Sequence, residues 1–173
     1  MSPAPADHVN AVELAGRTAR LERRAGLGQL PRLLEAGALE GTDVRAELEF
    51  GTFEGRVTVY VRIEGEVFLT CQRCLRPCAC SVEESASLAV VANDTDEVPG
   101  GYEPLLGDAE RLSVTEVIEE QVLLGLPLVP KHANAAQCGA ATTAPVAGGD
   151  DTAADEKQKP FANLRQLLDK STD

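Results

Sequence analysis

The stretch Arg56-Val-Thr-Val-Tyr-Val-Arg-Ile-Glu-Gly-Glu-Val-Phe-Leu-Thr70 decides the fold of this 173-residue chain. Its apolar side chains alternate with polar ones, and the same parity continues beyond Gly65 to Val67 and Leu69. A period of two residues is typical of a β-strand that buries one face. The stretch therefore predicts one long strand, with Gly65 as the candidate position for a bulge.

The same alternation is present on both sides of this stretch. It covers residues 43–50, before a turn bounded by Gly51 and Gly55, and residues 81–90, after a cluster of cysteines. Three consecutive strands with short connections form an antiparallel meander that has one buried face and one face in water.

Residues 113–124 have the pattern of an amphipathic helix that can cover the buried face. Ser113-Val-Thr-Glu116 is a capping box, in which the serine hydroxyl accepts a hydrogen bond from the Glu116 amide and the glutamate reaches back. The apolar stripe consists of Val114, Val117, Ile118, Val122 and Leu124, and the opposite, polar face consists of Glu116, Glu119 and Glu120. The expected fold class is α+β: an antiparallel meander of three or more strands with one face covered by a helix.

Composition divides the chain into four parts. Residues 1–40 are interpreted as an N-terminal arm with helices at 17–24 and 31–36, and residues 41–138 as an α+β core domain that carries the cysteine cluster. Residues 139–158 have almost no large apolar side chain and are predicted to be a flexible linker. Residues 159–173 are predicted to be a tethered, short amphipathic helix with Phe161 and Leu164 on its apolar face. Such a segment suits either docking on the core domain or capture by a groove of a partner.

The charge and the termini limit the classes of partner. A net charge of −12 disfavours general nucleic-acid binding, which needs a basic surface. The chain has no apolar run that approaches eighteen residues and no signal-peptide pattern, so we expect a cytoplasmic protein without a membrane partner. A small basic element is present between residues 15 and 32, where Arg17, Arg20 and Arg24 recur at helical spacing.

Cys71-Gln-Arg-Cys74 lies between two predicted strands and has the spacing of a zinc knuckle. Two thiolates at the tip of a hairpin can face one tetrahedral metal ion. The two remaining ligands are either the nearby Cys78 and Cys80 or a remote pair that follows the predicted helix. The candidate metal ligands that we retain are Cys71, Cys74, His132 and Cys138, with zinc as the candidate cofactor.

Two other interpretations of the cysteines stay open. Without a metal, the thiols are small core residues, which suits Cys78 and Cys80 because they share the parity of the core-facing Val82. Alternatively, Cys71 and Cys74 form a redox pair, although such pairs usually lie at a strand-to-helix turn, and this pair leads into another strand. The chain has no glycine-rich phosphate loop, no nucleophile elbow and no HExxH motif, so we expect neither an enzyme nor a small-molecule substrate.

Four stretches together resemble the YceD family, the large-ribosomal-RNA-subunit accumulation proteins. They are Leu69-Thr-Cys71-Gln-Arg73-Cys74, Tyr102-Glu-Pro104, Leu126-Pro-Leu-Val-Pro130-x-His132 with Cys138, and Lys159-Pro-Phe161-Ala-x-Leu164-x-x-Leu167. The resemblance implies a non-enzymatic factor in the synthesis, processing or stability of large-subunit ribosomal RNA.

The expected partners are pre-ribosomal large-subunit RNA or a ribosomal or RNA-processing protein. Because the chain is acidic and poor in aromatic residues, contacts with RNA should be few and local. The candidate phosphate ligands are Arg73 and Arg76 at the hairpin tip and Arg17, Arg20 and Arg24 in the arm. Phe161 and Leu164 are the candidates for recruiting a protein. The alternatives are a thiol-redox enzyme that uses Cys71 and Cys74, and a zinc-stabilised protein adaptor with no role in RNA.

Overall fold

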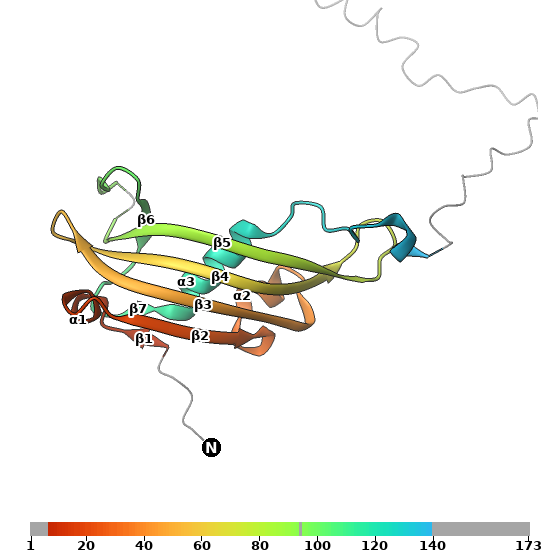
Figure 1. Ribbon diagram of the computed structural model, residues 1–173, viewed down its shortest axis with the longest axis horizontal. Coiled ribbons are helices and arrows are strands. Elements are labelled where there is room, and N and C mark those ends of the chain that lie inside the picture. Colours follow the sequence, from red (N-terminus) through yellow and green to blue (C-terminus); the bar gives the residue numbers. More distant parts are fainter. Residues whose placement is uncertain (1–6, 94, 140–173) are drawn as a thin grey trace, which may run out of the picture. The chain divides into compact units, whose positions relative to one another are not determined.

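The computed structural model describes residues 7–93 and 95–139, which form a twisted five-stranded sheet with helices on one face (Figure 1). The strands, in spatial order, are β2 (Arg20–Gly26), β3 (Leu39–Phe53), β4 (Arg56–Thr70), β5 (Pro77–Val91) and β6 (Glu103–Leu106). Strands β2 to β5 pair antiparallel, and β6 pairs parallel to β5. The α+β class and the antiparallel meander are confirmed.

The alternation predicted for the central strands is present in the structure. In β4, Val59, Val61 and Ile63 are buried, whereas the side chains between them face water. Val61 lies opposite Leu48 of β3 and Ala86 of β5, so the three long strands contribute side chains to one core. The long strands are stable because every second side chain along them packs into the core.

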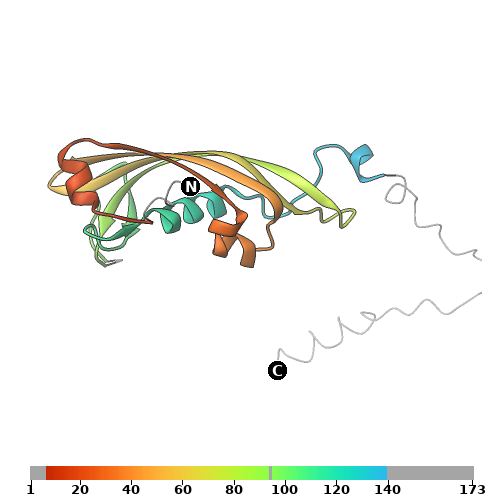
Figure 2. The same ribbon diagram turned by 90° about the horizontal axis from the view of Figure 1, so that it is seen from below.

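Three helices lie on this buried face (Figure 2). They are α1 (Ala11–Gly16), α2 (Pro31–Glu35) and α3 (Val114–Gly125), and the 3₁₀ helices η1 (Leu27–Gln29) and η2 (Ala135–Cys138) complete the described helices. Of the three, α3 has the longest apolar stripe, and Val114, Val117, Ile118 and Val122 pack into the core. No helix in the described part of the chain has the length and apolar content to cross a membrane.

The start of α3 is closed by two caps. The Ser113 hydroxyl accepts a hydrogen bond from the Glu116 amide over 3.2 Å, as the sequence predicts. The Asp7 carboxylate accepts from the Thr115 amide and from the Ser113 hydroxyl, each over 3.1 Å. Asp7 immediately precedes β1 (His8–Val9), which pairs with β7 (Leu112–Ser113), so residues 7–9 belong to the fold and His8 lies in a strand.

The prediction of a helix at residues 17–24 is wrong. Residues 20–26 form β2, which pairs with β3 from Arg20 opposite Glu49 to Gly26 opposite Asp43. A spacing of four residues places Arg20 and Arg24 on one face of a helix and equally on one face of a strand, so it does not distinguish the two. This part of the predicted arm therefore belongs to the sheet, whereas the helix predicted at residues 31–36 is present as α2.

Two side chains of α3 differ from the predicted amphipathic pattern. Glu119, assigned to the polar face, is only 1% exposed and accepts hydrogen bonds from the amides of Arg32 (2.7 Å) and Leu33 (3.4 Å). It thereby caps α2, whose own N-cap residue, Leu30, has no capping side chain. Leu124, assigned to the apolar stripe, is exposed.

Gly65 is not a bulge. It pairs in regular register with Val44 of β3 and Val82 of β5, and a Cβ atom there would lie 2.5 Å from the Asp43 carbonyl oxygen. The glycine is required because two backbones approach closely. The register shift in this pair of strands lies instead between Leu39 and Asp43 of β3. The predicted linker beyond Gly139, and the C-terminal segment with Phe161 and Leu164, lie outside the described residues.

Candidate metal centre

The hairpin between β4 and β5 positions the first two candidate ligands. Cys71 directly follows β4, and Cys74 lies in the turn. The Cys71 amide donates to the Arg76 carbonyl oxygen (2.9 Å), and the Cys71 carbonyl oxygen accepts from the Leu75 amide (2.8 Å). Leu75 has a φ of 59°, so the turn closes through a left-handed residue. This tight turn directs both thiols toward one side of the tip.

The other two candidate ligands follow α3. Cys138 is the last residue of η2, and His132 precedes this helix. Asn134 and Gln137 form a capping box at the start of η2: the Asn134 side chain accepts from the Ala136 amide (3.0 Å), and the Gln137 side chain accepts from the Asn134 amide (3.2 Å). The box holds the short helix, so the buried Cys138 thiol has a defined position.

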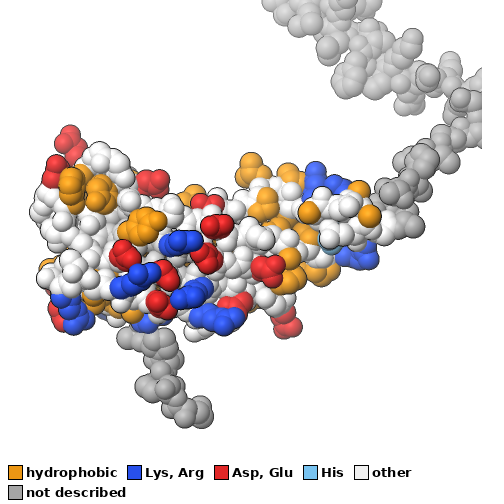
Figure 3. Space-filling model, in the orientation of Figure 1, with side chains coloured by type: hydrophobic (Ala, Val, Ile, Leu, Met, Phe, Trp, Pro, Cys, Tyr) orange, Lys and Arg blue, Asp and Glu red, His pale blue; other side chains and the backbone are white. Residues whose placement is uncertain are grey.

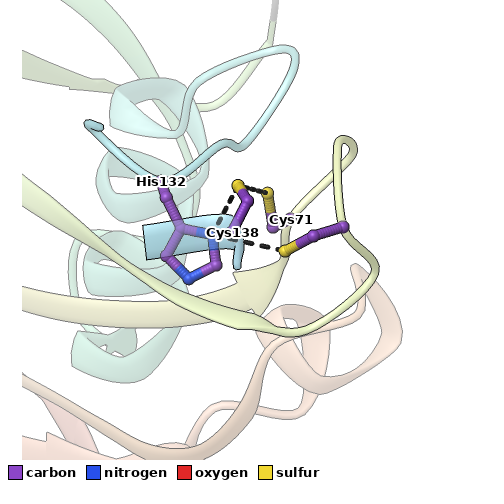
Figure 4. A group of neighbouring side chains, drawn as sticks. Cys71, His132 and Cys138 are labelled. Carbon is purple, nitrogen blue, oxygen red and sulfur yellow. Dashed lines mark hydrogen bonds between the residues drawn. The ribbon is translucent and has the colours of Figure 1, made fainter. Parts of the chain in front are cut away.

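The four predicted ligands lie together. Figure 4 shows how the side chains of Cys71, His132 and Cys138 face one another. All four ligand atoms are within 4.8 Å of one another. The Cys71 and Cys138 sulfur atoms are 4.0 Å apart, and the His132 Nδ1 atom is 3.5 Å from the sulfur atoms of Cys74 and Cys138. In a tetrahedral zinc site, two sulfur ligands are about 3.8 Å apart and a sulfur and a nitrogen ligand about 3.5 Å apart. The arrangement therefore has the dimensions of a Cys₃His zinc site.

The surroundings of Cys71 favour the thiolate form of its side chain. Burial raises its pKa, but the amides of His132, Arg73 and Cys74 donate hydrogen bonds that outweigh this effect and lower the pKa to about 5. Amide donors favour the charged form of a group that accepts them. The thiolate is the form of cysteine that binds a metal ion.

The Cys138 thiol has the opposite tendency. Burial raises its pKa, and the neighbouring thiols of Cys74 and Cys71 raise it further, because a second negative charge beside the first is unfavourable. A divalent cation between these sulfur atoms removes that repulsion, and its binding releases the remaining protons. A cation at the centre of the four side chains would therefore stabilise the thiolate form of the cysteines.

Contacts outside the ligand set connect its two halves. The Gln72 amide donates to the Pro130 carbonyl oxygen, and the Arg76 guanidinium donates to the Gln137 carbonyl oxygen, both over 2.8 Å. The Arg73 guanidinium lies 3.9 Å from the Cys138 sulfur. Such outer contacts orient metal ligands and tune their basicity. Gln72, Asn134, Pro130 and Gln137 were not predicted, although the Asn-x-x-Gln spacing is a recognisable capping signal.

Cys78 and Cys80 do not join the group. Both are buried on the core face of β5, as expected for small core residues. Burial, together with the neighbouring thiols of Cys80 and Cys71, raises the pKa of the Cys78 thiol to about 11. The fold therefore does not bring Cys71, Cys74, Cys78 and Cys80 together as one ligand set.

The basic element of the sequence is neutralised within the sheet. Arg20 pairs with Glu47 and Glu49, and Arg24 makes a two-pronged contact with Asp43 across β2 and β3. Basic and acidic side chains are interleaved over the outer face of the sheet (Figure 3). Arg17 lies at the end of α1, 3.8 Å from Glu13. The structure thus separates these three arginines from Arg73 and Arg76, which lie at the hairpin tip.

Comparisons with known proteins identify the family of the chain. The model of the family described as "Large ribosomal RNA subunit accumulation protein YceD" matches residues 59–168. A protein of Haemophilus influenzae with the same description is 30% identical over 146 residues, which cover 82% of this chain and 83% of that protein. No solved structure matches this chain. The chain belongs to the YceD family, as its four motifs predict.

Proposed function

We propose that this member of the YceD family is a non-catalytic cytoplasmic factor for the synthesis, processing or stability of large-subunit ribosomal RNA, and that its knuckle holds a structural zinc ion. The relative from Haemophilus influenzae bears the name of a large-ribosomal-RNA-subunit accumulation protein. The family match supports the role in ribosomal RNA. The observation that carries the zinc part of the proposal is the convergence of Cys71, Cys74, His132 and Cys138, because their spacing suits a closed site with four protein ligands.

The ion would act as a cross-link. It would join the tip of the β4–β5 hairpin to the segment after α3, and so hold both as one surface for partners. Four protein ligands leave no open position for water or substrate, which is the pattern of a structural zinc site. The partners expected are pre-ribosomal large-subunit RNA or a ribosomal or RNA-processing protein.

The burial of Cys71 argues against a redox role for this thiol. Its lowered pKa also suits a nucleophile, but the residue is 0% exposed, so a disulfide substrate has no approach to its sulfur. Cys74 is partly exposed, and its sulfur lies 3.5 Å from the His132 Nδ1 atom within the same group. Reactive cysteines are partly exposed. The low pKa is better explained by a thiolate that binds a metal.

A complementation experiment tests the proposal. The gene is deleted in its own host, and the ratio of large-subunit to small-subunit ribosomal RNA is measured. We expect the ratio to fall, to recover with the wild-type gene and with Cys80→Ala, and to recover poorly with Cys74→Ala. An unchanged ratio after deletion would contradict the role in RNA and leave the adaptor hypothesis. A recovery with Cys74→Ala equal to that of the wild type would contradict the role of the metal.

A further inference from the structure

The tip of the β4–β5 hairpin and the segment after α3 form a surface without acidic side chains, unlike the other described parts of the chain. Residues 67–82 and 121–139 contain no aspartate and no glutamate, although the whole chain has a net charge of −12. The cations of these segments are Arg73, Arg76 and Lys131, and all three are exposed. In the described part of the chain, none of them lies within 4.0 Å of a carboxylate, whereas Arg20, Arg24, Arg32, Arg45 and Arg62 all do.

Exposed aliphatic side chains accompany these cations. Leu75 is 75% exposed, Leu128 is fully exposed and Val129 is 53% exposed. The hydrogen bond from Gln72 to Pro130 joins their two segments, so the three side chains belong to one end of the molecule. Hydrophobic side chains and Lys or Arg side chains gather around η2 (Figure 3). We call the six residues Leu75, Leu128, Val129, Arg73, Arg76 and Lys131 the tip surface.

Leu75 carries an additional signal. Its φ of 59° is unfavourable for a residue with a Cβ, and glycine or asparagine would fit the turn with less strain. A large apolar side chain held in this conformation and pointing into water stabilises neither the turn nor the core. Strain of this kind clusters at functional sites, and the inference runs from the observed outlier to a function.

We infer that the tip surface binds a protein segment in which aliphatic side chains alternate with aspartate or glutamate. The aliphatic side chains of the partner would cover Leu75, Leu128 and Val129, and its carboxylates would pair with Arg73, Arg76 and Lys131. Complementary charge speeds encounter and selects the partner, and burial of the apolar side chains holds the complex. The inference rests on the proposed function, because it names the partner class of the knuckle.

Protein is favoured over RNA by the kind of apolar residue. Single-stranded RNA is bound through aromatic rings on which bases stack, and the tip surface has no aromatic residue. Contact with sugars and phosphates would leave the leucines uncovered. A second copy of the chain is disfavoured as the occupant, because a symmetric dimer through this surface would place the cations of one tip against those of the other. A cross-link to another copy of the same chain would contradict the inference.

The test is site-specific cross-linking in the host cell. The full-length chain carries the photoreactive residue p-benzoylphenylalanine at position 128, and the cross-linked peptide is identified by mass spectrometry. We expect a protein segment rich in aliphatic and acidic residues. A cross-link to RNA or to a basic segment, or no cross-link, would overturn the inference.

Affinity measurements then use a synthetic peptide with the cross-linked sequence. We expect Leu75→Asn and Lys131→Glu each to weaken its binding about tenfold, which is typical of central contacts in an interface. Leu106→Ser, which removes an exposed leucine of β6, is the matched control and should bind as the wild type does. Both tip variants should keep the zinc content of the wild type, because these side chains are exposed. Lys131→Glu should also keep its melting temperature, whereas Leu75→Asn should melt at the same or a higher temperature, because asparagine relieves strain in the turn. Equal affinities for all variants would contradict the inference.

The double variant Leu75→Asn/Lys131→Glu separates this inference from the proposed function. We expect it to restore the ribosomal RNA ratio poorly in the deletion strain. If it restores the ratio fully, the tip surface is not the partner site, whereas the proposed role in RNA stands. If deletion of the gene leaves the ratio unchanged, the proposed role itself fails.

Discussion

The sulfur atoms of Cys71 and Cys138 lie 4.0 Å apart, although the two residues are 67 positions apart in the chain. Cys71 directly follows the central strand β4, and Cys138 is the last residue of the short helix η2 beyond α3. A shared ion would therefore connect two distant parts of the chain that come together only in the folded state, so its binding free energy would stabilise that state.

Removal of the metal should lower the free energy of unfolding. A ligand that binds only the folded state, at a free concentration 1,000 times its dissociation constant, stabilises that state by about 4 kcal/mol. We expect a loss of this size when the full-length chain is unfolded by denaturant in the presence of a chelator rather than zinc. The sheet should remain folded without denaturant, because most of the core consists of apolar side chains that are not candidate ligands.

Cys138→Ala and Cys80→Ala form the matched pair for this measurement. Both replace a buried thiol, but only the first removes a candidate ligand. Elemental analysis should find one zinc ion per chain in Cys80→Ala and much less in Cys138→Ala. Equal zinc contents, or unfolding curves that do not respond to the chelator, would refute the metal site.

Glu119→Ala should destabilise the protein by about 2 kcal/mol. The buried carboxylate accepts two amide hydrogen bonds at the start of α2, and its removal leaves those amides without a partner. Glu120→Ala is the control, because it breaks only the exposed ion pair with Arg32 and should cost less than about 1 kcal/mol. Denaturant unfolding compares the two, and a similar loss for both would argue against the capping role.

The central part of the fold could be predicted because its signals are local. The parity of β4 is visible in fifteen consecutive residues, and the cap of α3 lies within four. The role of Glu119 depends on a helix that begins 88 positions earlier, at Pro31, and nothing near Glu119 in the sequence indicates this contact. The same holds for β2: the spacing of its arginines suits a helix as well as a strand, and only the pairing with β3 shows that it is a strand.

The candidate ligands could be grouped from the sequence because the chemistry of metal binding restricts the choice. Few residue types bind zinc, and the chain has only five cysteines and two histidines. The supporting contact from Gln72 to Pro130 joins two backbone groups, which every residue type except proline can offer on the donor side. Such contacts leave no mark in the sequence, so the outer part of the site required the structure.

The Asp7 cap should make stability depend on pH. Burial raises the pKa of the Asp7 carboxyl, but hydrogen bonds from Thr115 and Ser113 outweigh it, and the folded-state pKa lies below the usual 3.8. A depressed carboxyl pKa contributes stability above the unfolded-state pKa, and this contribution is lost as the pH falls through the folded-state value. Asp7→Ala should therefore cost about 1 kcal/mol at neutral pH, a typical value for a lost cap, and progressively less below about pH 4.

Thermal unfolding of the wild type and of Asp7→Ala between pH 7 and pH 3 measures the loss of stability that the substitution causes at each pH. Glu40→Ala, which removes an exposed carboxylate at the start of β3, should change stability little at any pH in this range. A cost of Asp7→Ala that stays constant down to pH 3 would show that the carboxylate does not act through its charge.

Gly65→Ala should destabilise the sheet, whereas Gly28→Ala should not. A Cβ atom at position 65 would lie 2.5 Å from the Asp43 carbonyl oxygen and 2.8 Å from the Val44 Cα atom, and both are backbone atoms of the neighbouring strand. Relief requires β3 to move away from β4, so we expect a loss of about 2 kcal/mol or more in denaturant unfolding. A Cβ atom at position 28 has no heavy atom within 4 Å, and its restriction of the unfolded chain should leave stability unchanged or slightly higher. If Gly65→Ala were as stable as the wild type, the two strands could not approach as closely as the structure shows.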